Sequence, residues 1–180
     1  MLWGELMSST KRGLLRDCRG SALIEFAAVA GPFIALIFAS LETSLVFFSQ
    51  QMLDTSAETM SRQIMTGEEQ KAGTTKAAFK QKVCGTLPDF MTCDRLLVNV
   101  EKVNAFESAS TAAPVITFDK DGNVTNTTEF DPGNPGDIVI MQVLYRWPSV
   151  TGPLGFGLGN LPNGERLLVT TSIFKTEKYE

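Results

Sequence analysis

The sequence predicts an α+β protein in which a long N-terminal transmembrane helix precedes a domain with a small antiparallel sheet. Two observations support this prediction. A strongly apolar segment lies near the N-terminus, and strand-like segments occur only after residue 95. The chain has 180 residues, which is enough for one small domain and a membrane segment but not for two full domains.

The membrane segment is predicted over about residues 26–48. Residues 26–45 contain nine Leu, Ile, Val or Phe residues and one acid, Glu42. At roughly −0.3 to −0.6 kcal/mol each, these nine contribute about −3 to −5 kcal/mol to insertion, which offsets the ~3 kcal/mol that a carboxylate costs at the bilayer centre. A conventional secretory signal is the alternative. It is disfavoured because Glu25 interrupts the apolar run and the small residues at 28–30 come too early for its cleavage site.

Basic residues before this segment set its expected orientation. The whole chain carries −4 and residues 1–20 carry +2, so the remainder carries −6. Lys and Arg are enriched on the cytoplasmic side of membrane helices. We therefore expect residues 1–20 to be a basic cytoplasmic leader and residues 67–180 to be an extracytoplasmic α+β domain. The acidic remainder has no basic stripe, which argues against nucleic acid as a partner.

The helix is expected to cover residues 21–66 and so to continue beyond the membrane. Apolar and small residues recur there at helical spacing, and Gly67 follows as a C-cap. The expected stripe consists of Phe48, Met52, Leu53, Ser56, Ala57, Met60 and Ile64. We interpret this stripe as core packing against the domain that follows, rather than as a ligand site.

Beyond Gly67 the sequence predicts one short helix, over residues 75–83, and several strands. The strands are expected at residues 96–103, 115–118 with 124–128, 138–145 and 167–174. Apolar and polar residues alternate only partly in the strand at 138–145, which indicates a central strand buried on both faces. Residues 119–123 are expected to form the turn between two strand candidates.

Cys84 and Cys93 are predicted to form a disulfide. They lie nine positions apart, on either side of a loop with turn residues. If the apolar segment spans a membrane, the pair lies in the oxidising compartment and Cys18 in the reducing one. Two free buried thiols are the alternative. A zinc site is disfavoured because the chain contains no histidine.

The sequence contains no motif that indicates catalysis, a cofactor or a metal. Without histidine the chain lacks the commonest general base and metal ligand. The acids at 119–129 do not fit an EF-hand, because Val124 and Phe130 occupy its glycine and glutamate positions. The glycine-rich stretch at 151–164 is neither a P-loop nor a dinucleotide fingerprint, and we interpret it as a loop. We therefore expect a protein that is not an enzyme and binds no cofactor.

A short motif opens the apolar segment: Gly20, four residues, then Glu25 and Phe26. By itself Glu25 is also compatible with an acid at a helix start, where acids suit the helix dipole. Together with the basic leader and the apolar run, however, the motif resembles the processing site of type IVb and Tad prepilins. The alanine-rich residues 26–30, Pro32 and the Gln pair at 50–51 extend this resemblance to the TadE family of the Tad (tight adherence) pilus system.

The resemblance implies a pilin-like fold and functional residues. A prepilin peptidase would cut between Gly20 and Ser21, and Glu25 with Phe26 would form the processing and assembly motif. In a filament, the Glu25 carboxylate could neutralise the α-ammonium group of a neighbouring subunit.

The implied function is that of a non-enzymatic minor pilin or pseudopilin that supports assembly of a Tad (Flp-type) adhesive pilus. Its implied location is the bacterial inner membrane, with the N-terminus cytoplasmic and the C-terminal domain periplasmic. Its implied partners are the inner membrane, the prepilin peptidase, the Tad assembly platform and other Tad pilins. The alternative is an uncleaved single-pass anchor with an extracytoplasmic binding or scaffold domain.

Overall fold

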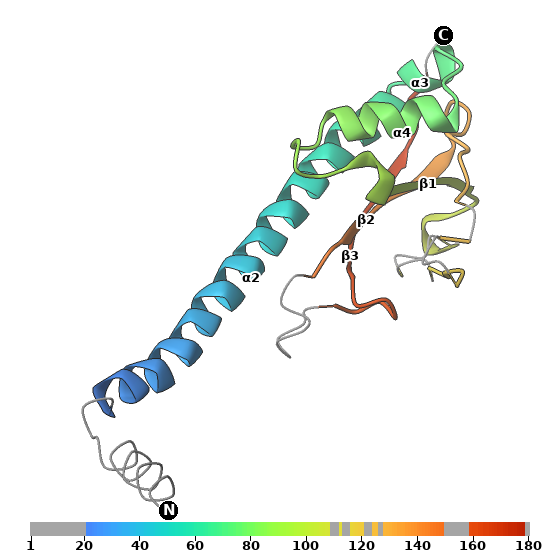
Figure 1. Ribbon diagram of the computed structural model, residues 1–180. Helices are drawn as coiled ribbons and strands as arrows, with labels where there is room; N and C mark the ends of the chain where they lie inside the picture. The colour runs from blue at the N-terminus through green and yellow to red at the C-terminus, as the bar shows by residue number, and fades with distance from the viewer. Residues whose placement is uncertain are drawn as a thin grey trace, which may run out of the picture. The chain divides into compact units, whose positions relative to one another are not determined.

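The computed structural model describes residues 21–108, 112, 116–120, 124–125, 128–149 and 159–178. Its longest element is helix α2, Ser21–Met65 (Figure 1). The chain divides into two compact units, Met1–Leu41 and Glu42–Glu180. The described part of the first unit is helical throughout and includes Pro32. We refer to the second as the globular unit.

Helix α2 ends where the sequence predicts a C-cap. The backbone N–H groups of Thr66 and Gly67 donate to the carbonyls of Arg62 and Ile64, at 2.9 and 3.1 Å. Gly67 has φ 80°, a left-handed conformation that glycine adopts without a steric cost. The chain can therefore turn sharply at this point, and the predicted cap is confirmed.

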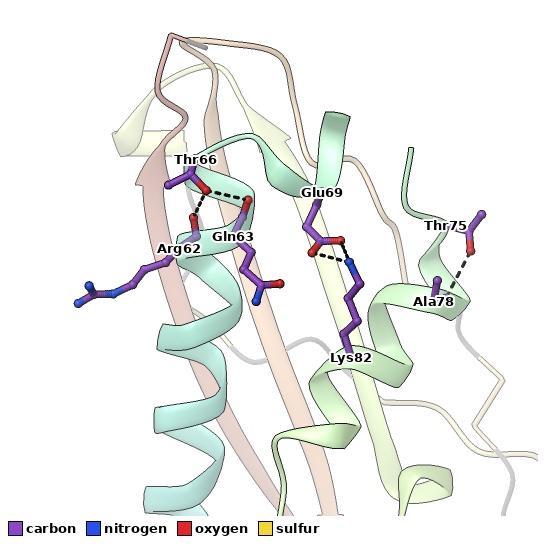
Figure 2. A network of polar contacts seen from close by, with 7 residues as sticks. All are labelled: Arg62, Gln63, Thr66, Glu69, Thr75, Ala78 and Lys82. Carbon is purple, nitrogen blue, oxygen red and sulfur yellow. Dashed lines mark hydrogen bonds and ion pairs between the residues drawn. The ribbon is translucent and has the colours of Figure 1, made fainter. Parts of the chain in front are cut away.

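Two short helices follow, α3 (Glu68–Lys71) and α4 (Lys76–Gly85). Thr75 caps α4, because its Oγ1 accepts a hydrogen bond from the N–H of Ala78 at 3.3 Å (Figure 2). The helix predicted over residues 75–83 is thus confirmed and extends two residues further. A 3₁₀ turn, η2 (Cys93–Arg95), then leads into the sheet, and a second one, η3 (Phe106–Ser108), follows the first strand.

The sheet has three antiparallel strands in the order β1-β2-β3: β1 Leu96–Val103, β2 Ile138–Trp147 and β3 Arg166–Lys175. In this register Val98 pairs with Val143, and Val143 pairs with Thr170. β2 is the central strand and is buried along most of its length. The predicted α+β class and the doubly buried central strand are therefore confirmed.

The strand pair predicted at 115–118 and 124–128 does not form within the described residues. Phe118 and Val124 make a single antiparallel bridge there, and the intervening residues 121–123 lie outside the description. On the outer edge of β1, Val100 makes only one further bridge, to Phe130. Strand-forming residues need a neighbouring strand to pair with. In the described residues, the segments at 115–118 and 124–128 are joined by the Phe118–Val124 bridge and do not form a strand ladder.

The core of the globular unit lies between α2, α4 and the sheet. Buried side chains come from every one of these elements: Leu53, Met60, Ile64, Phe79, Val83, Leu96, Val139, Met141 and Tyr145. The buried face of α2 continues toward the N-terminus through Ser49 and Val46. The interpretation of the helical stripe as core packing is confirmed from Met52 to Ile64.

The prediction was wrong for the first residue of that stripe, Phe48. Phe48 is 49% exposed, whereas Val46 is 5% exposed. Successive helical residues are rotated by ~100°, so a row of every fourth residue drifts around the helix and Phe48 points ~160° away from Ile64. Val46 returns to the direction of Ile64 after five full turns. Phe48 is thereby placed outside the core.

Candidate functional site

The first candidate region is the apolar helical segment before the globular unit. Its large side chains are exposed, including Leu23 at 75%, Phe26 at 74% and Phe33 at 61%. Within the described residues α2 is the one helix long and apolar enough to cross a membrane. Its most apolar 18-residue window has a mean hydropathy of 2.2 and is 0% buried. Since no other part of the described chain buries this window, the segment is a candidate membrane anchor rather than a core helix.

The predicted processing motif lies at the start of this segment. Ser21 is the first residue of α2, and Glu25 and Phe26 follow within its first two turns, both on its exposed surface. Gly20 lies outside the described residues. Cleavage after Gly20 and the assembly role of Glu25 and Phe26 therefore stay predictions.

Glu42, the first residue of the globular unit, is enclosed by protein. It is 6% exposed, and one of its carboxylate oxygens accepts a hydrogen bond from the Ser149 hydroxyl at 2.9 Å. The two residues lie 107 positions apart. This contact could not be found from local sequence patterns, in which Glu42 stands out only as an acid inside an apolar run.

A chain of aromatic rings lies in the same unit. The ring centroids of Phe48 and Phe90 are 6.1 Å apart, and those of Phe90 and Trp147 are 6.3 Å apart with an edge-on geometry. Tyr145 follows at 6.4 Å from Trp147. These spacings are typical of favourable aromatic pairs. We call these four residues the aromatic cluster. It joins α2, the loop after α4, and β2, so sequence reasoning did not detect it.

The loop that carries Phe90 is closed by a disulfide between Cys84 and Cys93, whose Cα atoms are 5.6 Å apart. This bond fits the pairing expected from the sequence. The loop is also held by the N–H of Thr92, which donates to the Tyr145 hydroxyl oxygen at 3.0 Å. Leu87 and Met91 are buried beneath it, whereas Phe90 is 49% exposed. The loop thus presents one aromatic side chain from a well-anchored backbone.

A buried carboxylate links α3 to α4. Glu69 is 1% exposed, and its two carboxylate oxygens lie 2.8 and 2.9 Å from Lys82 Nζ (Figure 2). A buried acid requires such a partner, because removing a charge from water is costly. We assign this pair a structural role. Within the described residues, no group of three or more His, Cys, Asp or Glu residues could hold a metal ion.

A second ion pair links Lys102 on β1 to Asp137 just before β2. Lys102 Nζ lies 2.8 Å from Asp137 Oδ2. The hydrogen bond from Lys102, followed by one from the Asn134 backbone, lowers the pKa of Asp137 below its usual 3.8. The same hydrogen bond raises the pKa of Lys102 above its usual 10.5. Both groups are therefore held in their charged forms at neutral pH, as expected of a surface contact that supports the sheet.

Comparison with known proteins bears on the N-terminal region. A family model described as "TadE-like protein" matches residues 20–62. The comparisons with curated proteins and with solved structures each found no match. The matched stretch contains Gly20, Ser21, Glu25 and Phe26 together with the exposed apolar helix, and it ends before the disulfide and the sheet. The resemblance predicted from the motif is thus confirmed, and residues 20–62 are similar to the TadE-like family of pilus assembly proteins.

Proposed function

We propose that the protein is a membrane-anchored, non-enzymatic minor pilin or pseudopilin that supports assembly of a Tad pilus. The observation that carries this proposal is the coincidence of two features in one segment. Residues 20–62 match the TadE-like family, and the same residues include an apolar helix whose side chains are unburied. TadE-like proteins are associated with pilus assembly, and a pilus subunit needs an exposed apolar helix to insert into the membrane.

The length of the exposed segment supports the anchor. We place the span at residues 22–41 rather than at the expected 26–48, because Glu42 and Val46 are buried in the globular unit. Residues 22–41 make up about 20 helical positions, which rise ~30 Å and match the hydrocarbon thickness of a bilayer. The globular unit begins directly afterwards at Glu42. In the proposed topology the basic leader stays in the cytoplasm and the globular unit lies in the periplasm, anchored in the bacterial inner membrane. The Cys84–Cys93 disulfide supports this side, because disulfides persist in oxidising compartments.

Processing gives the proposed subunit its mature form. The prepilin peptidase would cut after Gly20, and Ser21 would become the N-terminus of α2. Glu25 then lies one helical turn from the new α-ammonium group. In a low-dielectric environment its carboxylate would attract such a group on a neighbouring subunit. The proposed partners are the peptidase, the assembly platform and other Tad pilins.

Intact-mass measurement of the membrane-purified protein, with and without a co-expressed prepilin peptidase, tests this proposal. We expect the peptidase to remove residues 1–20, and Gly20→Val to prevent the cut. Gly31→Val is the matched control, because a Cβ at Gly31 meets nothing within 4 Å. This control should still be cut after Gly20.

An unchanged mass in the presence of an active peptidase, or a cut elsewhere, would refute the pilin assignment. The alternative of an uncleaved single-pass anchor with a binding or scaffold domain would then replace it. Resistance to extraction at alkaline pH tests the anchor separately, because an integral helix stays with the membrane under that treatment. Release by that treatment would contradict both functions.

A further inference from the structure

The N-terminal end of the globular unit exposes a concentration of large apolar side chains. On α2, Leu45 is 50% exposed and Phe48 is 49% exposed. Phe90, 49% exposed, lies beside Phe48 through the aromatic cluster. We call Leu45, Phe48 and Phe90 the apolar patch, since Leu45 and Phe48 are neighbours three positions apart on one side of the helix. Isolated exposed apolar residues are common, but three large ones that lie together indicate a surface that contacts something apolar.

Phe90 is held in this exposed position by the surrounding structure. The disulfide, the Thr92–Tyr145 hydrogen bond and the buried side chains of Leu87 and Met91 fix the loop on both sides of it. A ring presented from an ordered loop loses little conformational entropy when it binds. The patch is therefore already arranged for contact.

The same region has few charged side chains on its surface. Glu42 is buried and hydrogen-bonded to Ser149, so its carboxylate does not face outward. Residues 43–53 of α2 carry no formal charge, and the disulfide loop carries one, Asp89. An uncharged, aromatic-rich surface is typical of the boundary between lipid headgroups and acyl chains. The exposed acid at 89 argues against a strongly anionic lipid surface.

We propose that the apolar patch inserts into the headgroup–acyl boundary of the bilayer and thereby docks the globular unit on the membrane. This inference rests on the proposed anchor. Leu45 to Phe48 follow Leu41 by four to seven residues, which corresponds to ~6–11 Å of helical rise, a distance comparable to the headgroup layer. The patch thus continues the predicted lipid contact of the preceding helix and extends it to Phe90, which lies 42 positions beyond Phe48 in sequence.

Depth-dependent fluorescence quenching tests this docking on the full chain. Tryptophan occurs only at positions 3 and 147, so Trp3→Phe and Trp147→Phe give a chain without tryptophan. Phe90→Trp then places one probe in the patch, and Phe48→Trp is a second probe. Phe106→Trp is the matched control. Phe106 is also exposed, at 53%, but lies beyond the far end of β1, a strand ~23 Å long.

Each variant is reconstituted into phosphatidylcholine vesicles whose acyl chains carry bromine either near the headgroup or near the chain end. We expect shallow bromine to reduce the emission of Trp at 90 and 48 by about half and deep bromine to reduce it less. Trp at 106 should be unaffected in both. Retention of the Cys84–Cys93 disulfide in each variant, measured by alkylation, shows that the loop is intact.

Probes at 90 and 48 that stay unquenched, in protein that resists alkaline extraction, would overturn the docking and leave the anchor in place. Release of the protein by alkaline extraction would instead contradict the anchor itself. A third outcome is that the probes at 90 and 48 stay unquenched in vesicles that hold several copies of the protein but are quenched in vesicles that hold one copy each. That would show that a second protein copy, not lipid, covers the patch, and it would also overturn the docking.

Discussion

Removing the Cys84–Cys93 disulfide should destabilise the globular unit by a predictable amount. The bond closes a loop with a sequence separation of 9. In the chain-entropy description, a crosslink over a loop of this length lowers the entropy of the unfolded chain and thereby raises the free energy of unfolding by about 2.6 kcal/mol at 25 °C. Both sulfurs belong to half-buried residues, so Cys84→Ser with Cys93→Ser leaves hydroxyls that can reach water. We therefore expect the loss to come mainly from the unfolded state.

Urea unfolding of the full chain in detergent micelles measures this loss. Trp147 reports on the globular unit once Trp3→Phe removes the other tryptophan. For an m value of about 1–3 kcal/mol per M, a loss of 2.6 kcal/mol lowers the urea midpoint by about 1–2.5 M. Cys18→Ser is the matched control, since Cys18 lies outside the disulfide, and its midpoint should equal that of the parent.

Two results would refute the reasoning. One is an unchanged midpoint in the double variant, which would mean that the crosslink does not restrict the unfolded chain. The other is alkylation of Cys84 and Cys93 in the native protein without reductant, which would mean that the bond is absent. The second result would also weaken the periplasmic topology, because that topology accounts for the bond.

Two further predictions concern ion pairs of the globular unit. Lys82→Met leaves the buried Glu69 carboxylate without its cation. Because the Lys82 side chain is 45% exposed, we expect the free energy of unfolding to fall by about 2–3 kcal/mol, less than the roughly 3–5 kcal/mol typical of fully buried pairs. Lys80→Met on the same helix should change the urea midpoint little, and equal effects of the two variants would contradict the assignment. For the Lys102–Asp137 pair, the lowered pKa of Asp137 means that its contribution is present above pH 3.8 and is lost as pH falls through the folded-state value. The raised pKa of Lys102 means that its contribution is present below pH 10.5 and is lost as pH rises through the folded-state value. The destabilisation by Lys102→Met should therefore be largest at neutral pH and shrink at both extremes, and a pH-independent difference in urea midpoint would contradict the pairing.

Several elements of the fold were predictable because their signals are local. β1 has the predicted bounds, and β2 and β3 differ from theirs by at most two residues at an end. The C-cap at Gly67 was predictable for the same reason, since only a residue tolerant of positive φ ends a helix in this way. In each case the deciding interactions lie within a few residues of one another.

The candidate site was predictable only in part. The exposed apolar helix and the TadE-like motif at its start follow from a continuous stretch of sequence. The disulfide was expected from spacing and topology. Phe90 and Trp147 carried no signal, because a loop phenylalanine and a strand tryptophan become neighbours only when the loop packs against the end of β2.

The sequence by itself determined the apolar helix, its TadE-like start and the α+β order of elements, and it favoured a Cys84–Cys93 disulfide over two free thiols. The first three depend on composition, periodicity or a motif along the chain, whereas the disulfide was favoured by cysteine spacing and the expected topology. The tertiary structure decided which side of α2 is buried, where Glu42 finds its hydrogen-bond partner, and which aromatic rings stay exposed. These outcomes depend on distant segments meeting. A helix offers several apolar faces, and only the packing of α4 and the sheet against one of them selects Val46 for the core and leaves Phe48 at the surface.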